Sequence, residues 1–260
     1  MLPGPLTRKK KSNCHLMQPR FRMFAGPNGS GKTVLFDHLR NKGYIHTEIF
    51  VSADRIENDL KNKGKFFFTS YRVKVSEAEF KCHIKLSGLF QKLEDKSFVD
   101  KINIISGILT LNGDQKKINS YIASFIATYL CEKLLLTKQS FCFETVLSHS
   151  SKIELIEKAK AAGYKTYLYF VFTDNWKLNI ERVKLRVLEG GHNVDHKKIE
   201  NRYFRSLKNF SQAARLSNST FLIDNSNEFT RVAEFTNGTV NYVISPFPDW
   251  FREYFDPTNF

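Results

Sequence analysis

The chain has 260 residues, a hydrophobic content of 42% and a formal net charge of +14 at pH 7. This hydrophobic content is enough for a packed core, which excludes a chain that is disordered throughout. There is no long apolar run and no signal peptide with an apolar core, so neither a membrane-spanning nor a classically secreted protein is indicated, and we expect a cytoplasmic location. An effector secreted by another route would look the same.

Neither the cysteines nor the basic residues define a site by themselves. The lysines are spread along the whole chain, a pattern more typical of a solvated surface than of a nucleic-acid site. Residues 1–18 contain the basic run Arg8–Lys11 and are expected to form a flexible leader that could contact an acidic partner. The cysteines lack the paired short spacings of a zinc site or a disulfide framework. They are Cys14, Cys82, Cys131 and Cys142.

Residues 26–33 have the complete pattern of a phosphate-binding loop, between a strand-like run at 21–25 and a helix-like run at 34–40. In such a loop, backbone N–H groups surround a triphosphate, glycines allow close approach, and the following helix points its positive end at the phosphates. Lys32 can reach the β- and γ-phosphates, and the Thr33 hydroxyl can hold Mg²⁺. We therefore expect ATP and Mg²⁺ as cofactors. The expected nucleotide-binding residues are Gly26, Pro27, Asn28, Gly29, Ser30, Gly31, Lys32 and Thr33.

Strand-like segments alternate with helix-like segments along most of the chain. This alternation predicts βαβ units and a mainly parallel sheet covered by helices, that is, a three-layer α/β/α fold of the P-loop NTPase or kinase type. The loops that follow the strands should meet at one edge of the sheet, where open α/β sheets bind ligands. The expected strands lie near 20–25, 47–52, 139–144, 164–172 and 219–224.

The remaining stretches give the expected domain organisation. We expect one main domain at 19–235, and its helical patterning predicts a large, mostly helical insertion at 55–138. Within the insertion, the apolar run 101–111 fits a strand or a helix equally well. A turn at 190–196 is a candidate lid. A C-terminal extension at 236–260, with a short β-like run at its start, is expected to pack on the main domain.

Two acids follow expected strands. Asp54 could take a proton from an attacking hydroxyl or help to hold Mg²⁺. It could equally be the N-cap of the next helix. Glu144, followed by Thr145, could bind substrate hydroxyls or water on the metal, or the pair could simply end a strand and cap the next element.

The segment around residues 182–191 combines basic and glycine residues. Arg182 and Arg186 are four residues apart and therefore share a helix face, an arrangement that suits a transferring phosphoryl group. Gly190 and Gly191 provide the flexible joint that a closing lid needs. The alternative is a salt-bridged surface helix with a glycine cap. His192 has no Cys or acidic neighbours at ligand spacing, so we do not expect it to bind metal.

The segment Asp224–Ser226 follows the last expected strand. Nucleotide kinases place a loop against the adenine at this position, so Asn225 is a candidate nucleotide-binding residue. A plain β-turn explains the same residues equally well.

Together these segments resemble the zeta toxin family of P-loop kinases, in the family's order and over roughly residues 20–230. Two of these segments are more specific to the family than the P-loop, which many ATPases share. They are the Glu-Thr pair and the segment with Arg-Val, Arg-Val and Gly-Gly-His. The matching segments are 26–33, Val51–Asp54, Phe143–Ser148, Gly163–Tyr164, Glu181–Val194, Arg202–Leu207 and Asp224–Ser226.

The resemblance implies a kinase that transfers the γ-phosphate of ATP to a hydroxyl of a small substrate, with a UDP-amino sugar such as UDP-N-acetylglucosamine as the expected acceptor. It also implies an antitoxin protein as a partner. The implied roles are a general base (Asp54), stabilisers of transferred charge (Lys32, Arg182 and Arg186), a Mg²⁺ ligand (Thr33) and substrate-pocket residues (Ser52, Glu144 and Thr145).

Other functions remain open from the residues alone. A polynucleotide or RNA-end kinase would use the same P-loop with the basic surface, although nucleic acid is the less favoured partner and no membrane partner is expected. A nucleotide-binding protein without turnover is a further alternative. An ABC-type ATPase is disfavoured, because the chain has neither a Leu-Ser-Gly-Gly-Gln signature nor a long aliphatic strand with paired acids.

Overall fold

The structure, a computed structural model, describes residues 18–245 except 92, 94, 113–119 and 192–193. Most of the expected leader, the residues His192 and Asn193, and the extension beyond residue 245 therefore lie outside the described residues.

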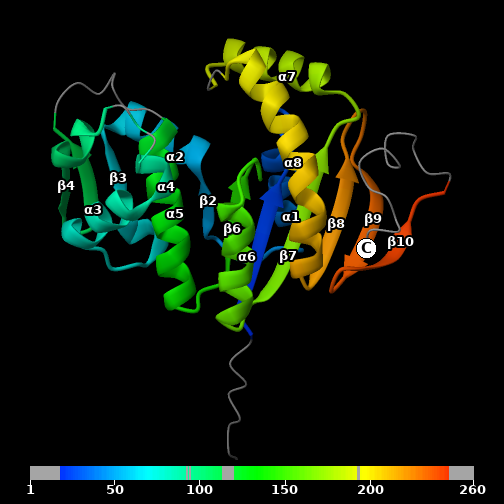
Figure 1. Ribbon diagram of the computed structural model, residues 1–260, viewed down its shortest axis with the longest axis horizontal. Coiled ribbons are helices and arrows are strands. Elements are labelled where there is room, and N and C mark those ends of the chain that lie inside the picture. The colour runs from blue at the N-terminus through cyan, green and yellow to red at the C-terminus, as the bar shows by residue number, and fades with distance from the viewer. Residues whose placement is uncertain (1–17, 92, 94, 113–119, 192–193, 246–260) are drawn as a thin grey trace, which may run out of the picture.

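A seven-stranded sheet forms the centre of the molecule, with strand order β10-β9-β8-β7-β1-β6-β2 (Figure 1). The five strands from β8 to β2 in this order run parallel, and β9 and β10 are antiparallel additions at one edge. The expected mainly parallel sheet is confirmed. The strands are β1 (Arg20–Ala25), β2 (Phe50–Ser52), β6 (Phe141–Thr145), β7 (Lys165–Phe172), β8 (Ser219–Asp224), β9 (Thr230–Thr236) and β10 (Thr239–Val243).

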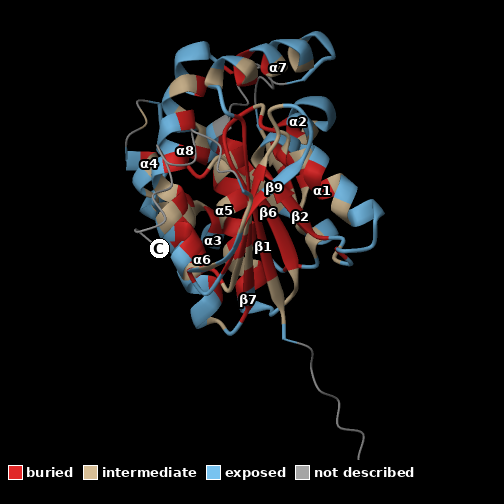
Figure 2. Ribbon diagram, turned by 90° about the vertical axis from the view of Figure 1, so that its right-hand side faces the viewer, coloured by how far each residue is buried: buried red, intermediate tan, exposed pale blue. Residues whose placement is uncertain are grey.

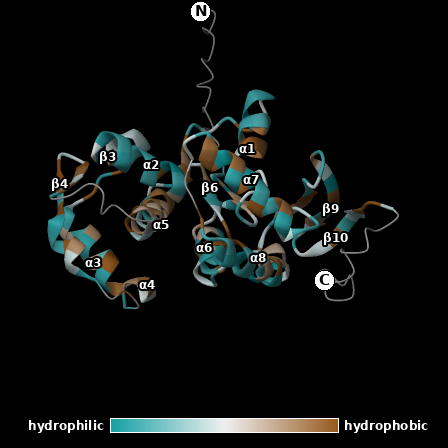
Figure 3. Ribbon diagram, turned by 90° about the horizontal axis from the view of Figure 1, so that it is seen from above, coloured by the Kyte–Doolittle hydropathy of each residue, from teal (hydrophilic) through white to brown (hydrophobic). Residues whose placement is uncertain are grey.

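Helices lie on both faces of this sheet and complete three layers, as expected. Seen from above, α1 lies on one side of the sheet, and α6 and α8 lie on the other (Figure 3). Helix α7 crosses the top of the sheet, over the carboxyl ends of the parallel strands (Figure 1). The four helices are α1 (Lys32–Asn41), α6 (Ser151–Ala161), α7 (Trp176–Leu188) and α8 (His196–Leu216).

The abundant phenylalanines form the core on both faces of the sheet, whose central strands are almost wholly buried (Figure 2). On the α1 face, the Phe24 ring stacks on Tyr169 with centroids 4.8 Å apart and meets Phe36 edge-on at 5.4 Å. On the other face, Phe170 packs against Phe210 of α8 at 4.8 Å. Buried aromatic side chains remove large apolar areas from water, so these contacts stabilise the three layers.

The long insertion lies beside β2 and contains a second sheet besides its helices (Figure 1). The run 101–111, which fitted a strand or a helix, forms the hairpin β4–β5. Ser106 and Gly107 make its two-residue turn, both with positive φ, as hairpin turns prefer. The elements are α2 (Ala53–Lys63), β3 (Lys65–Phe67), η1 (Phe68–Tyr71), α3 (Glu77–Leu86), α4 (Gly88–Gln91), η2 (Ser97–Lys101), β4 (Ile102–Ile105), β5 (Ile108–Leu111) and α5 (Ser120–Leu136).

No helix among the described residues is both long and apolar enough to cross a membrane.

Candidate active site

The P-loop occupies the turn between β1 and α1, at the carboxyl edge of the central strand. Gly29 has a φ of +76°, and a Cβ there would lie 2.6 Å from the carbonyl oxygen of Asn179 on α7. Gly31 has a φ of +95°, and a Cβ there would collide with the side-chain amide of Asn225. The loop is therefore pressed against α7 and against the loop after β8, and only glycine fits at these two contacts.

Lys32, the first residue of α1, is buried and turned toward its own loop. Its Nζ donates a hydrogen bond to the carbonyl of Pro27 at 2.6 Å. Burial lowers the pKa of Lys32, and the carboxylates of Glu144 and Asp54 oppose this effect. A buried ammonium in this loop can exchange the Pro27 carbonyl for a phosphate oxygen, which gives a stronger, charge-assisted hydrogen bond.

Thr33 and Glu144 lie against each other beneath the P-loop. The Thr33 hydroxyl lies 3.0 Å and 3.1 Å from the two carboxylate oxygens of Glu144, and Ser52 also hydrogen-bonds this carboxylate. Burial raises the pKa of Glu144, and Lys32 only partly offsets it. A desolvated carboxylate beside a hydroxyl offers the hard oxygen donors that Mg²⁺ takes through one or two protein groups, the remaining positions being filled by water and phosphate. These residues therefore fit the expected magnesium.

The described residues hold no group of three or more His, Cys, Asp or Glu side chains that could bind a metal ion. A magnesium ion held with the help of a nucleotide does not require such a group.

Asp54 lies in the first turn of α2, directly after β2. The N-cap of this helix is Ser52, so Asp54 is not the N-cap, which was the alternative explanation for this acid. Its carboxylate is half exposed and lies 3.7 Å from Nη1 of Arg186 on α7. Residues 132 positions apart in the sequence thus face each other across the edge of the sheet. An exposed carboxylate at this edge can accept a proton from a bound hydroxyl.

The two arginines of α7 have different surroundings. Arg186 faces Asp54, whereas Arg182 donates from Nη1 to the carbonyl of Asn225 at 2.7 Å and from Nη2 to that of Ser226 at 3.1 Å. Arg182 therefore holds α7 to the loop after β8. Both arginines lie near the P-loop, but only Arg186 faces the acid expected to act as base.

The loop after β8 supports the P-loop directly. The side-chain amide of Asn225 donates to the carbonyl of Ser30 at 2.9 Å. Asp224 accepts from the backbone N–H of Ser226 at 2.7 Å and from its hydroxyl at 2.6 Å, which fixes the turn. Asn225, expected to bind the nucleotide, positions the phosphate-binding backbone in this structure.

Thr145, expected in the substrate pocket, ends β6 next to Glu144, and its hydroxyl accepts from the N–H of Leu147 at 3.3 Å. The side chain thus shapes the loop that leads from β6 to α6. Arg202 on α8 lies near Asp54, and burial lowers the pKa of its guanidinium. The candidate site therefore has a further cation near Asp54, beyond the four expected catalytic residues.

Sequence patterns did not single out Asn179 and Thr173, which fix the start of α7. The Thr173 hydroxyl donates to Oδ1 of the fully buried Asn179 at 2.5 Å. The hydroxyl of Tyr203, on α8, donates to the carbonyl of Thr173 at 2.6 Å. A polar residue inside an amphipathic helix gives no signal of burial, so only the fold could reveal this network.

The end of α7 holds Arg186 in place. Gly191 donates from its backbone N–H to the carbonyl of Arg186 at 2.8 Å, and a Cβ at Gly191 would lie 2.7 Å from Cγ of the same arginine. Helix α8 starts at the N-cap Asp195, whose side chain accepts from the N–H of Lys198 at 3.1 Å. His192, which we did not expect to bind metal, lies outside the described residues. The lid function of this turn stays a prediction.

Comparison with known proteins points to one family. The family model for zeta toxins matches residues 110–233, so the expected resemblance is confirmed over that part of the chain. No curated protein matches the chain.

Two crystal structures of AvrRxo1-ORF1 with AvrRxo1-ORF2, one with ATP and one with sulphate ions, match with TM-scores of 0.58 and 0.56 at 15% identity. Each match covers 92% of this chain and 64% of the other, so the chain spans less than two thirds of those proteins. A structure from the PezAT toxin-antitoxin system of Streptococcus pneumoniae matches at 0.47, also at 15% identity, over 86% of this chain and 75% of the other.

Proposed function

Because residues 110–233 match the zeta toxin family, we propose that this protein is an ATP-dependent kinase that transfers the γ-phosphate to a hydroxyl of a small molecule. The family match supports a kinase-type, nucleotide-binding function. The observation that carries the finer proposal is the meeting, at one sheet edge, of a complete P-loop with Asp54 and Arg186, 3.7 Å apart. The expected acceptor is a UDP-amino sugar.

Each residue has a role that follows from its surroundings. The P-loop backbone N–H groups and Lys32 bind the phosphates, and α1 points its positive end at them. Thr33 and Glu144 would hold Mg²⁺, which neutralises charge on the β- and γ-phosphates when bound. Asp54 accepts the proton of the acceptor hydroxyl, and Arg186 and Arg202 lie where charge develops during transfer.

An antitoxin and a cytoplasmic location belong to the same proposal. The AvrRxo1-ORF1 structures that share this fold are complexes with a second protein, AvrRxo1-ORF2, which supports a protein partner here as well. Co-purification with the product of a neighbouring reading frame, followed by an activity assay of the complex, tests this part independently of the chemistry.

The test of the kinase is ATP turnover by the purified protein with and without a panel of UDP-sugars, followed by mass spectrometry of the sugars. We expect a gain of one phosphate on a UDP-amino sugar. Asp54→Asn should keep ATP affinity and lose about 10²–10⁴-fold in transfer rate. Lys32→Ala should abolish transfer. Transfer at the normal rate by Asp54→Asn would contradict the base assignment.

Transfer to the ends of RNA or DNA, with no sugar modified, would keep the fold and favour the polynucleotide kinase alternative. In that case binding should weaken steeply with salt.

A further inference from the structure

Two buried amide side chains lie where the P-loop meets α7, and each has one atom without a hydrogen-bond partner among the described residues. These atoms are Oδ1 of Asn28 in the P-loop and Nδ2 of Asn179 on α7. Asn28 is 6% exposed, and Asn179 is fully buried. Buried polar groups are nearly always hydrogen-bonded in folded proteins, because an unpaired one keeps the full cost of leaving water. The two atoms therefore need an explanation.

The two atoms are complementary and belong to neighbouring parts of the structure. Nδ2 of Asn179 can only donate a hydrogen bond, and Oδ1 of Asn28 can only accept one. Gly29, the residue after Asn28, lies directly against the backbone of Asn179, since a Cβ on Gly29 would come within 2.6 Å of its carbonyl oxygen. The Thr173 hydroxyl holds Oδ1 of Asn179 at 2.5 Å, which leaves Nδ2 as the free end of this amide.

Lys32 restrains the P-loop backbone on the other side of Asn28. Its Nζ donates to the carbonyl of Pro27 at 2.6 Å, and Pro27 directly precedes Asn28. A triphosphate in the loop offers this ammonium an anionic partner in place of a neutral carbonyl, and the hydrogen bond between two charged groups is the stronger one. Nucleotide binding therefore releases the peptide unit between Pro27 and Asn28.

Asn179 and Arg186 lie on the same face of α7. They are seven residues apart, which corresponds to two helical turns and a rise of about 10 Å. Arg186 lies 3.7 Å from Asp54 at the edge of the sheet. Because a helix is a rigid element, a bond that fixes Asn179 to the P-loop also sets the position of Arg186.

We propose that Asn179 is a positioning residue that couples nucleotide binding at the P-loop to the placement of Arg186. When a triphosphate draws Lys32 away from the Pro27 carbonyl, Oδ1 of Asn28 accepts a hydrogen bond from Nδ2 of Asn179. This bond fixes α7 to the filled loop and holds Arg186 where charge develops during transfer. The inference rests on the proposed function and adds the contact through which the bound nucleotide orders this arginine.

A double-mutant cycle between Asn28 and Asn179 tests the coupling, with the non-hydrolysable analogue AMP-PNP and Mg²⁺ as the probe. Calorimetry measures AMP-PNP affinity in the native protein, in Asn28→Ala, in Asn179→Ala and in the double variant. Each single change should weaken binding about tenfold, and the double variant should bind no more weakly than the weaker single variant, because all three lose the same bond. Without AMP-PNP, the two changes should act independently on thermal unfolding, because the bond is then absent.

Trp176, the first residue of α7, reports on the helix itself. The chain has two tryptophans, so the measurements are repeated in a Trp250→Phe background, in which Trp176 is the only one. Saturating AMP-PNP should change the fluorescence emission of Trp176 in this background, and the change should be lost when Asn28→Ala or Asn179→Ala is added. A merely structural role of Asn179 would lower the Tm without removing this response to the nucleotide.

The matched control is Thr220→Val, which removes another buried polar atom that lacks a hydrogen-bond partner among the described residues. Thr220 lies near the start of β8, away from the P-loop edge of the sheet, so its replacement should leave AMP-PNP affinity and the Trp176 response unchanged.

Two results would overturn the inference: a double variant weakened by the product of the two single effects, or Trp176 emission that does not respond to AMP-PNP. Normal coupling without phosphate transfer from ATP would count against the kinase alone. A protein that does not bind AMP-PNP would contradict both the inference and the proposed function.

Discussion

Replacing Gly29 by alanine perturbs the P-loop without touching any charged group. The new Cβ would lie 2.6 Å from the carbonyl oxygen of Asn179 and 3.2 Å from its carbonyl carbon and Cα. These are backbone atoms of α7, and they cannot move without displacing the helix. The loop must therefore shift away from α7, and its N–H groups leave the positions that surround the phosphates.

A matched control separates collision from backbone strain. Gly43, at the other end of α1, has a φ of +75° against +76° for Gly29, and a Cβ there would meet nothing within 4 Å. Both alanine variants carry the left-handed strain of about 1–2 kcal/mol. Only Gly29→Ala adds the collision, which is worth about 1–3 kcal/mol in a packed environment.

The assay compares the two variants by thermal unfolding and by calorimetric titration with AMP-PNP. Since each kcal/mol lowers the Tm of a chain this size by about 2–4 °C, Gly29→Ala should melt about 2–12 °C below Gly43→Ala. Its affinity for AMP-PNP should be about tenfold weaker or worse, whereas Gly43→Ala should bind normally. Equal melting temperatures and equal affinities in the two variants would refute the close approach of the P-loop to α7.

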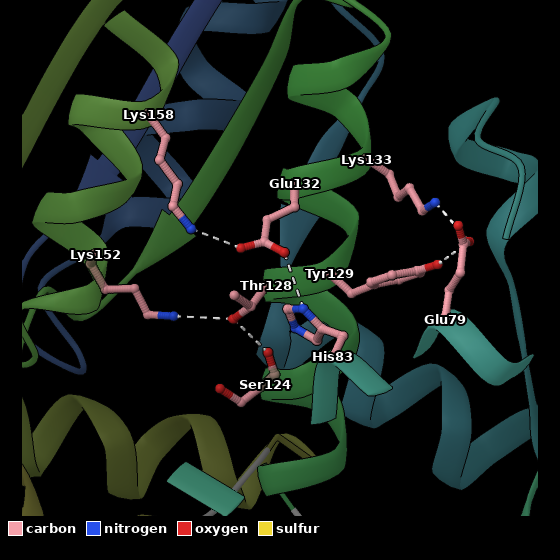
Figure 4. Close-up of polar contacts among 9 residues, drawn as sticks. All are labelled: Glu79, His83, Ser124, Thr128, Tyr129, Glu132, Lys133, Lys152 and Lys158. Atoms are coloured by element: carbon pink, nitrogen blue, oxygen red, sulfur yellow. Dashed lines mark hydrogen bonds and ion pairs between the residues drawn. The ribbon is translucent and has the colours of Figure 1, made fainter. Parts of the chain in front are cut away.

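Three further predictions concern charged groups. Arg182→Ala removes two hydrogen bonds to loop carbonyls and should lower the free energy of unfolding by about 1–3 kcal/mol and slow transfer; an unchanged Tm together with an unchanged rate would contradict its bracing role. Burial raises the pKa of Glu144, so the stability that this carboxyl contributes falls as pH rises above the pKa that it has in the unfolded chain. Glu144→Gln should therefore raise the Tm of the ATP-free protein at neutral pH while it impairs transfer. A lower Tm in the variant would count against this prediction. Hydrogen bonds from His83 and Lys158 (Figure 4) lower the pKa of Glu132 to about 2, so its contribution to the free energy of unfolding is present above pH 4.5 and is lost as pH falls toward 2. In Glu132→Gln, the free energy of unfolding measured with urea should therefore depend less on pH within this window. The same pH dependence in the variant and the native protein would refute the pairing.

The fold of the main domain could be predicted largely from local patterns. The five parallel strands, the P-loop and its helix each show a contiguous pattern of hydrophobic periodicity or of turn residues, and the structure confirms them. Strand β9 was not predicted, because its sequence from Thr230 to Thr236 mixes charged, polar and apolar residues without strict alternation. Its pairing with β8 stabilises the strand conformation that the local sequence does not specify. The sheet in the insertion was missed for a similar reason, since short strands such as Lys65–Phe67 depend on partners far along the chain.

In the candidate site too, some contacts could be predicted from the sequence and others are set only by the fold. That Asp54 and Arg186 meet follows from the rule that loops after parallel strands share one edge. That Arg182 contacts the loop after β8 does not follow from its spacing to Arg186, because the helix rotation about its axis is set by packing.

The direct passage from β2 into α2 has a mechanical consequence. Ser52 ends the strand and Ala53 begins the helix, so Asp54 has no flexible joint on its sheet side and is rigidly attached to α2. Helix α2 in turn packs along α5. The position of Asp54 at the edge of the sheet is therefore set by the packing of α2 on α5 and not by a hinge in the backbone.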